Sequence, residues 1–393
     1  MVLAVLSSAM AILVPASPSL GLGLSRPAVS TDAIDWPTFA FSAHRDGSNP
    51  FEHILTPETV GSLQVAWTSN LGGPTFNQPV LANGMVYQVA WGVLIAMDAS
   101  TGAVVWKAPL HPADPPIGGI TVANGMVYLG DERALWTFDA ATGSPVWRIL
   151  RSTGPTSPLV SGHRVYVGGA GGWLYSANAL SGKRGWARLI LQDTTFRTLA
   201  LGAGDLYITT FSIGNDVIRV DAGTGMVAGG ISLPQQVLGV SWHDGIEFVG
   251  TGNGTGNLFA IDPGTDKVLW EYDSSDNFLS GSPAVQDGVV YSGGGTYSDP
   301  GHVFALDAGT GALIWSYETP DGVPGVSVAG GVVYAAADDG IIRALDAANG
   351  DLLWSFDARS QVAHPPIIAN GMVYVATMAG RMYAFALPAG LGR

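Results

Sequence analysis

Hydrophobic residues along the chain occur in short runs, and Gly, Asn, Asp and Pro punctuate the sequence between them. A typical unit consists of an apolar run, an Asn-Gly-like turn, a "VVY" run, a Gly-rich loop, an "LxALD" run, a "TG" turn and a run ending in Trp. No stretch keeps the 3.6-residue period of an amphipathic helix. The pattern therefore predicts short β-strands joined by tight turns.

This unit recurs with a period of about forty residues, which is the length that a four-stranded propeller blade requires. An aromatic residue in its second strand marks eight copies: Tyr87, Tyr128, Tyr166, Tyr207, Phe248, Tyr291, Tyr334 and Tyr374. An Asp precedes a Trp by eight residues in five copies: Asp98/Trp106, Asp139/Trp147, Asp262/Trp270, Asp307/Trp315 and Asp346/Trp354. In the third copy Asn178 replaces the Asp before Trp186, and in the fourth Asp221 leads to Gly229 in place of Trp.

Each part of the motif has a packing role. The Asp accepts backbone N–H groups inside its turn, and the Gly after it supplies a positive φ. The Trp places a large apolar plate between neighbouring sheets, with its N–H directed at a carbonyl. None of these roles involves catalysis or ligand binding.

The last copy is incomplete, because Ala386 stands where the motif Asp belongs and no Trp follows. The N-terminal stretch "LQVAW", Leu63–Trp67, resembles a final strand without a preceding unit. Closure of the ring by these two chain ends would remove the exposed strand edges. We therefore predict an all-β fold: an eight-bladed β-propeller with four-stranded antiparallel blades, completed in its C-terminal blade by an N-terminal strand. The predicted organisation is a leader at 1–34, a lead-in at 35–61 and the propeller at 62–388.

Composition limits the partners and the location. The net charge is −14 and no basic run occurs, which argues against nucleic acid and anionic membrane surfaces. The absence of Cys excludes disulfides, thiolate zinc sites and a lipoprotein anchor. The apolar run at residues 2–14 is typical of a secretory signal and too short to span a bilayer. We expect a secreted or cell-envelope protein, monomeric and without a transmembrane span in its mature form; an N-terminal segment retained as an anchor is the alternative.

The repeated "LDAxTGxxxW", preceded by "ANGMVYVA", resembles the pyrroloquinoline-quinone-like (PQQ-like) propeller repeat from about Trp36 to Leu387. The lead-in "DWPTFAFSAHRDGSNPFEHILTPETVGSLQVAW" also resembles the segment before the first blade of secreted members. The resemblance implies one of two activities. Quinoprotein dehydrogenases bind PQQ and Ca²⁺ on the propeller axis, whereas outer-membrane assembly scaffolds bind proteins without a cofactor. The dehydrogenases are longer and many carry adjacent cysteines, so the short loops and missing Cys here favour the binding class.

Candidate ligand-binding residues are those that enter each innermost strand and point towards the axial channel: Asn77, Gln78, Arg197, Gln236, Asp276, Asn277 and His364. Such a ring could hold a polar or anionic ligand by hydrogen bonds, or could simply solvate a water-filled channel. We predict no metal site, because Asp338 and Asp339 fall in an expected turn, and Asp46, Ser48 and Glu52 in an expected solvated loop. Four Trp residues outside the motif, with packing between blades expected for each, are Trp91, Trp136, Trp173 and Trp242.

The sequence thus favours an exported, non-catalytic binding or scaffold propeller that presents a polar loop face to a peptide, protein or glycan. No catalytic residue and no cofactor are predicted. The alternative is a PQQ- and Ca²⁺-dependent alcohol or sugar dehydrogenase that uses Arg197 and Asp276 near the quinone. A purely structural envelope or matrix protein is a third interpretation.

Overall fold

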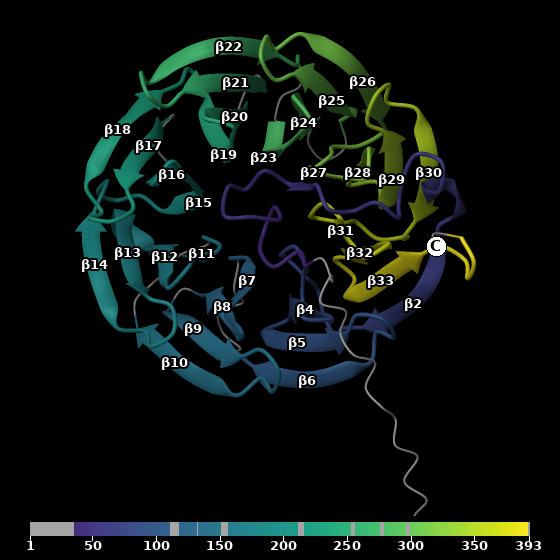
Figure 1. Ribbon diagram of the computed structural model, residues 1–393, viewed down its shortest axis with the longest axis horizontal. Coiled ribbons are helices and arrows are strands. Elements are labelled where there is room, and N and C mark those ends of the chain that lie inside the picture. Colours follow the sequence, from purple (N-terminus) through teal and green to yellow (C-terminus); the bar gives the residue numbers. More distant parts are fainter. Residues whose placement is uncertain are drawn as a thin grey trace, which may run out of the picture. The chain divides into compact units, whose positions relative to one another are not determined.

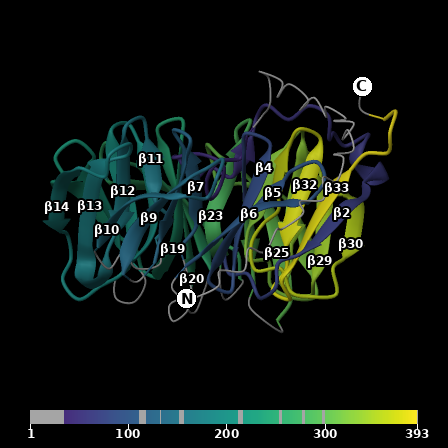
Figure 2. The same ribbon diagram turned by 90° about the horizontal axis from the view of Figure 1, so that it is seen from below.

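Eight β-sheets arranged as a ring form the described part of the chain in the computed structural model (Figure 1). The structure describes residues 35–110, 118–131, 133–150, 156–210, 216–252, 256–275, 279–295 and 299–391. Within each sheet, strands that follow one another in sequence pair antiparallel, from an innermost strand at the axis to an outermost strand at the rim. Figure 2 shows the same ring from its side. The predicted eight-bladed propeller is confirmed.

Blades 1 to 4 follow the chain in order. Blade 1 contains β3 (Val80–Ala82), β4 (Met85–Ala90), β5 (Val93–Asp98) and β6 (Val104–Pro109). Blade 2 contains β7 (Ile120–Ala123), β8 (Met126–Gly130), β9 (Ala134–Asp139) and β10 (Pro145–Leu150). Blade 3 contains β11 (Leu159–Ser161), β12 (Arg164–Gly168), the 3-10 helix η2 (Ala170–Gly172), β13 (Trp173–Asn178) and β14 (Arg184–Leu189). Blade 4 contains β15 (Phe196–Gly202), β16 (Asp205–Thr210), β17 (Asp216–Asp221) and β18 (Val227–Ser232).

Blades 5 to 8 continue the ring. Blade 5 contains β19 (Gln236–His243), β20 (Ile246–Gly252), β21 (Asn257–Asp262) and β22 (Lys267–Asp273). Blade 6 contains β23 (Leu279–Gln286), β24 (Val289–Gly294), β25 (Gly301–Asp307) and β26 (Leu313–Thr319). Blade 7 contains β27 (Val326–Ala329), β28 (Val332–Ala336), β29 (Ile341–Asp346) and β30 (Leu352–Asp357). Blade 8 contains β31 (Ile367–Ala369), β32 (Met372–Ala376), β33 (Arg381–Ala386) and, from the other end of the chain, β2 (Gln64–Asn70), which follows the 3-10 helix η1 (Val60–Ser62).

In every blade but the fourth, a Trp on the outermost strand links the blade to the next one. In blade 1 the Trp106 indole donates to the Ala140 carbonyl of blade 2 at 3.1 Å, and the Tyr87 hydroxyl donates to the same carbonyl at 3.1 Å. Gly143 follows with φ +72, and a Cβ there would lie 2.5 Å from the Trp106 ring. The "TG" glycine is therefore required twice, by its backbone conformation and by the ring that covers it.

Ring closure follows the predicted pairing. β2 pairs antiparallel with β33, with Gln64 opposite Ala386 and Asn70 opposite Arg381. Blade 8 lacks its own motif turn, so the Trp354 indole of blade 7 donates to the Leu63 carbonyl, 3.1 Å away, just before β2. The N-terminal strand therefore supplies both the missing strand and the missing acceptor.

The segment before β2 runs around the axis, which the sequence did not predict; Figure 1 shows it crossing the centre of the ring. We call residues 36–49 the axial segment. It contacts the inner edge of every blade, from blade 1 to blade 8, through these hydrogen bonds: Leu81 N to Trp36 O, Val122 N to Pro37 O, Arg45 Nη2 to Pro158 O, Leu201 N to Ala43 O, Trp242 N to His44 O, Val285 N to Asp46 O, Val328 N to Gly47 O and Asn49 Nδ2 to Ile368 O. Its residues Ser48–Asn49 form β1, parallel to β27. Innermost strands otherwise leave backbone groups unpaired at the axis, and the axial segment satisfies part of them.

The solvated loop expected at Asp46, Ser48 and Glu52 is wrong. Glu52 is buried, at 1% exposure, and its carboxylate accepts from the N–H groups of Ile54 (2.8 Å), Leu55 (3.2 Å) and Gly371 (2.9 Å). The bond from Gly371 fastens the stretch just after the axial segment to blade 8, and the bonds from Ile54 and Leu55 hold that stretch in its turn. The Glu52 carboxylate therefore binds backbone N–H groups rather than solvent.

Candidate axial binding pocket

A cavity of about 350 Å³ lies on the propeller axis, at the end of the ring where the innermost strands begin. Every blade contributes to its wall, for example through Asn77, Gly119, Ser157, Arg197, Leu238, Ser282, Ser327 and His364. The crossing from an outermost strand to the next innermost strand delivers each of these residues to the axis. The fold therefore gathers eight separate parts of the chain around one small volume.

The axial segment closes the inner end of this pocket with Phe39, Ala40 and Arg45. The Arg45 side chain is buried, at 1% exposure, and its Nε donates to the Leu199 carbonyl at 2.9 Å. Its remaining donors reach the Thr38 hydroxyl, the Phe39 carbonyl and the carbonyls of Ser157 and Pro158. Burial lowers the pKa of Arg45 to about 9, so the guanidinium stays protonated at neutral pH. A positive charge therefore lies in the pocket floor.

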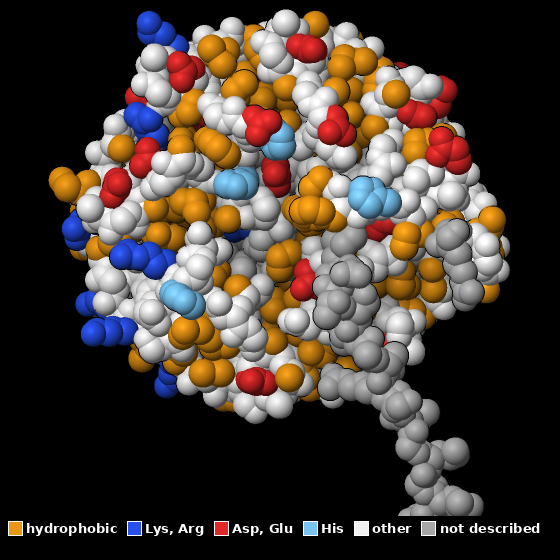
Figure 3. Space-filling view, in the orientation of Figure 1, with side chains coloured by type: hydrophobic (Ala, Val, Ile, Leu, Met, Phe, Trp, Pro, Cys, Tyr) orange, Lys and Arg blue, Asp and Glu red, His pale blue; other side chains and the backbone are white. Residues whose placement is uncertain are grey.

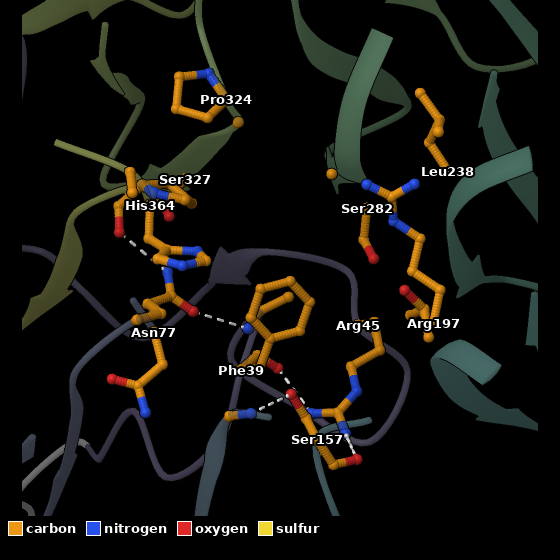
Figure 4. Close-up of a pocket in the computed structure, with 18 of the residues that line it drawn as sticks. Phe39, Arg45, Asn77, Ser157, Arg197, Leu238, Ser282, Pro324, Ser327 and His364 are labelled. Atoms are coloured by element: carbon orange, nitrogen blue, oxygen red, sulfur yellow. Dashed lines mark hydrogen bonds between the residues drawn. The ribbon is translucent and has the colours of Figure 1, made fainter. Parts of the chain in front are cut away.

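Two titratable side chains stand in the wall. Figure 4 shows Arg197 on the same side of the pocket as Arg45, and His364 with Asn77 on the opposite side. Burial lowers the pKa of Arg197, and it also lowers the pKa of His364. The His364 Nε2 lies 2.9 Å from the Phe76 carbonyl, and because a carbonyl only accepts, Nε2 carries the proton. At neutral pH His364 is thus a neutral donor, and the cationic groups of the pocket are the two arginines.

Two of the predicted amide side chains, Gln78 and Asn77, join parts of the pocket wall to one another. Gln78 accepts from the Ala40 N–H at 2.9 Å and donates to the Pro365 carbonyl at 3.0 Å. Asn77 accepts from the Gln88 amide at 2.5 Å and donates weakly to the Gly118 carbonyl at 3.4 Å. Both are buried. Gln78 therefore fixes the axial segment to the ring, and Asn77 presents little free hydrogen-bonding capacity.

Of the seven predicted binding residues, the structure brings Asn77, Gln78, Arg197 and His364 together in one pocket. Gln236 is half-buried at the start of β19 and is not among the lining residues. Asp276 and Asn277 lie outside the described residues.

Sequence reasoning missed Phe39 and Arg45, since the lead-in has no repeat that would place it on the axis. It also missed Phe76, although this residue directly precedes the predicted Asn77. The one usable signal for Arg45 was a lone base within the polar stretch 42–49.

The donor set of the pocket matches the cofactors of quinoproteins only in part. Among the described lining residues there is no Asp or Glu, whereas protein Ca²⁺ sites are built largely from carboxylate and carbonyl oxygens. In the described ranges no three His, Asp or Glu side chains gather as metal ligands. The pocket's charged groups fit an anion, such as a carboxylate of the quinone, but they do not fit the metal ion. Asp338 and Asp339 lie in the turn before β29, where Asp339 pairs with Arg343 at 2.6 Å.

The four Trp residues for which packing between blades was expected divide into two groups. Trp136 donates to the Asp131 carboxylate at 2.7 Å, and Trp242 packs against His44, with 5.1 Å between ring centres. Trp91 is 70% exposed and Trp173 is 40% exposed, so the expected packing between blades is wrong for Trp91 and incomplete for Trp173. The backbone N–H of Trp91 donates to the Pro74 carbonyl, which places this exposed residue beside the segment that leads to Phe76.

A ring of eight blades with an axial pocket defines the chain as a β-propeller, and comparison with known proteins defines its family. A family model described as outer membrane protein assembly factor BamB matches residues 61–228, 213–323 and 299–390. These matches cover nearly the whole propeller, so the chain belongs to this PQQ-like repeat family. No curated protein sequence matches the chain. Among the described residues, no helix has the length and apolar character needed to cross a membrane.

Solved structures similar to this chain come from both branches that the repeat implied. Quinohemoprotein alcohol dehydrogenase from Comamonas testosteroni has a TM-score of 0.75 at 17% identity, over 90% of this chain and 80% of that one. BamB from Moraxella catarrhalis has a TM-score of 0.67 at 16% identity, over 82% and 99%. The computationally designed protein Ika8 has a TM-score of 0.67 at 18% identity, over 81% and 98%. At these identities the likeness is one of fold, so function must be argued from the site.

Proposed function

We propose that this chain is a non-catalytic binding propeller whose axial pocket takes the carboxylate of a peptide, protein or acidic glycan. One observation carries the proposal: the pocket has Arg197 in its wall and Arg45 in its floor, and no acidic side chain among its described lining residues. In a chain with a net charge of −14, such a pocket is a local reversal of sign.

The two arginines have separate roles. Arg45 uses its donors on neighbouring oxygen atoms, so it contributes positive potential rather than direct contact. We assign the contact with the ligand to Arg197 because it lines the pocket wall and is only partly buried, and a guanidinium binds a carboxylate through two parallel hydrogen bonds. Low polarity around both groups strengthens the attraction relative to water.

The mouth of the pocket suits a ligand that extends beyond the carboxylate. Phe76 lines the pocket and remains 40% exposed, and the exposed Trp91 stands beside the same crossing segment. Aromatic side chains that are apolar and exposed frequently anchor peptides and sugar rings. The proposed ligand therefore places its acid on the axis and its body against blade 1.

Calorimetric titration with D-glucuronate and with D-glucose, which lacks the carboxylate, tests this function. The proposal predicts saturable binding of glucuronate, at least ten-fold weaker binding of glucose, and a loss of at least ten-fold in glucuronate affinity for Arg197→Gln. A tripeptide with a free C-terminus and its amidated form provide the same contrast for peptides. If neither acid is preferred over its neutral partner, the proposed function is wrong.

The second candidate is the PQQ-dependent dehydrogenase, favoured by the similarity of fold to quinohemoprotein alcohol dehydrogenase. The described lining residues offer donors for an anionic quinone but no carboxylate for Ca²⁺, so they form only part of a dehydrogenase centre. Added PQQ with Ca²⁺ should then bind without supporting dye reduction by alcohols or aldoses. Sustained turnover in that assay would replace the binding function with the enzymatic one.

We further propose that the protein acts outside the cytoplasm as a monomer. The apolar run at residues 2–14 supports export, and the family is named for an outer-membrane assembly factor. N-terminal sequencing of the protein recovered from culture supernatant and envelope fractions would test this location.

A further inference from the structure

Blade 3 differs from the other blades in charge. Residues 140–192 contain no Asp or Glu, although the chain has 31 acidic residues and 17 basic ones. The same stretch contains six bases: Arg148, Arg151, Arg164, Lys183, Arg184 and Arg188. Figure 3 shows Lys and Arg side chains gathered along one side of the ring, where Figure 1 places β13 and β14. The acidic character of the protein is therefore interrupted from the outermost strand of blade 2 through blade 3.

In blade 3 the neutral Asn178 replaces the motif Asp, but the turn that follows it is kept. Asn178 Oδ1 accepts from the N–H groups of Leu180 (3.1 Å) and Ser181 (2.9 Å) and from the Ser181 hydroxyl (2.9 Å). In blade 1 the carboxylate of Asp98 accepts the equivalent three bonds, from Ser100 N–H (3.1 Å) and from the N–H and hydroxyl of Thr101 (both 2.9 Å). Since the turn accepts either residue, the change at position 178 serves to remove a negative charge from this place.

The outermost strand of blade 3 also departs from its siblings. Before the motif Trp, blade 1 has the exposed pair Val104 and Val105, whereas blade 3 has Arg184 and Gly185. A Cβ at Gly185 would lie 2.8 Å from the Ser176 hydroxyl, so the glycine leaves room above that serine. Blade 3 therefore has a basic side chain and a glycine where blade 1 has two apolar side chains.

These departures line one pocket of about 270 Å³, with His163, Arg164, Lys183 and Arg184 around it and Asn178 and Ser176 within it. The Ser176 side chain is 2% exposed, and its hydroxyl has no hydrogen-bond partner among the described residues. In the described part of the chain no carboxylate lies within 4 Å of Arg164, Lys183 or Arg184. The pocket therefore combines unneutralised bases with a buried hydroxyl that lacks a partner.

We propose that this pocket is a second binding site, separate from the axial pocket, and that it takes an oxyanion: sulfate, phosphate or a carboxylate. Arg184 and Arg164 supply planar forks for oxyanion oxygens, and Lys183 supplies a point charge. The Ser176 hydroxyl donates a further hydrogen bond. Asn178 and Gly185 complete the site by removing the charge and the bulk that the repeat places there in other blades.

Calorimetric titration of the full chain with sodium sulfate and with sodium phosphate at low ionic strength tests the site. We expect saturable binding that weakens as salt is added. Asn178→Asp keeps the turn but puts a carboxylate into the pocket, and it should weaken sulfate binding by at least ten-fold. Arg184→Val, which restores the apolar residue of other blades, should do the same.

Two variants separate this site from other effects. Asp307→Asn makes the reverse change at the equivalent turn of blade 6 and should bind sulfate as the wild type does. Arg197→Gln removes the anion contact proposed for the axial pocket, and Asn178→Asp placed in that background should still weaken sulfate binding by at least ten-fold. Retention on dextran sulfate beads distinguishes the source: retention that Asn178→Asp abolishes assigns the site to anions carried on a polymer, and sulfate binding without retention assigns it to small anions. Absence of saturable anion binding, or equal binding by Asn178→Asp, would overturn the site.

Discussion

Seven contacts between neighbouring blades use a Trp, and the contact between blades 4 and 5 uses an Arg. At six of the seven an indole N–H donates to a carbonyl of the next blade's motif turn, as Trp315 does to Ala347 at 3.0 Å, and at the seventh Trp354 donates to Leu63, just before β2. At the exception, Arg219 Nη1 donates to the Pro263 carbonyl, which occupies the equivalent position in blade 5. The same acceptor is satisfied by a different side chain from a different strand.

The large side chain and the small one swap strands at this contact: the large residue lies on the third strand of the blade and the small one on the outermost strand. In blade 6 the large Trp315 of the outermost strand lies opposite the small Ala305, whereas in blade 4 Gly229 lies opposite Arg219. The turn of the next blade changes as well, because Asp266 (φ +52) stands where the Trp contacts have Gly. With no ring above it, this position holds a carboxylate 3.5 Å from the Arg219 guanidinium. What the two kinds of contact share is a carbonyl acceptor and one large side chain that fills the space between the blades, so neither contact depends on Trp as such.

The largest effect is expected at a Trp contact. Trp315→Ala should lower the free energy of unfolding by about 3–5 kcal/mol, since it removes a buried ring and a hydrogen bond. Urea unfolding followed by circular dichroism measures the change. Leu313→Ala, an exposed change on the same strand, is the control, with an expected effect below about 0.5 kcal/mol. Similar losses for the two variants would contradict the packing role of the ring.

The Arg contact should be nearly as costly to break. Arg219→Ala leaves Asp205 and Asp266, at 3.8 and 3.5 Å from the guanidinium, without their cation. We expect a loss of about 2–3 kcal/mol, below the value for a fully buried pair because the side chain is partly exposed. Arg219→Lys should recover less than half, since one ammonium group cannot bond both the Pro263 and Ala228 carbonyls while meeting the acids. Full recovery by Lys would show that only charge matters.

Rebuilding the Trp contact sharpens the comparison. Gly229→Trp alone should cost about 1–3 kcal/mol by overpacking, because a Cβ at Gly229 lies 2.6 Å from Arg219 and from Asp266. Combining it with Arg219→Ala and Asp266→Gly reproduces the residues of the other contacts and should recover most of that loss. A triple variant less stable than Gly229→Trp alone would mean that these three positions do not compensate for one another.

The smallest effect concerns pH. Glu247, buried in blade 5, has its pKa raised by burial and by Asp266 to about 8, against 4.5 for an ordinary Glu. The folded state therefore holds a proton that the unfolded state releases, so wild-type stability falls as pH rises from about 4.5 to about 8. Relative to Glu247→Gln, the wild type should lose about 1 kcal/mol between pH 5.5 and 6.5. Parallel stability profiles for the two proteins would contradict the raised pKa.

Much of the fold could be predicted because it is repetitive. Eight copies of one pattern fix the blade number, and the incomplete copy ending at Ala386 predicts closure by Leu63–Trp67, as β2 and β33 show. The Arg contact could not be predicted in this way. Gly229 is visible as a departure, but Arg219 compensates for it from another strand and bonds to another unit.

In the candidate site too, residues supplied by the repeats could be predicted, and the residue supplied by the axial segment could not. Arg197 and His364 lie where each blade begins, so the repeat placed them near the axis. Arg45 reaches the axis through a segment without repeats, whose path is set by unpaired backbone at the inner strand edges. Gln78 was correctly placed near the axis, but its two hydrogen bonds join the ring to that segment, which periodicity alone does not reveal.

A crystal structure of the chain with D-glucuronate bound is the most direct test of the binding function. We expect the sugar carboxylate in the axial pocket, within hydrogen-bond distance of the Arg197 guanidinium, with the sugar ring towards Phe76. A carboxylate bound away from Arg197, or an axial pocket that holds only water at saturating glucuronate, would contradict it.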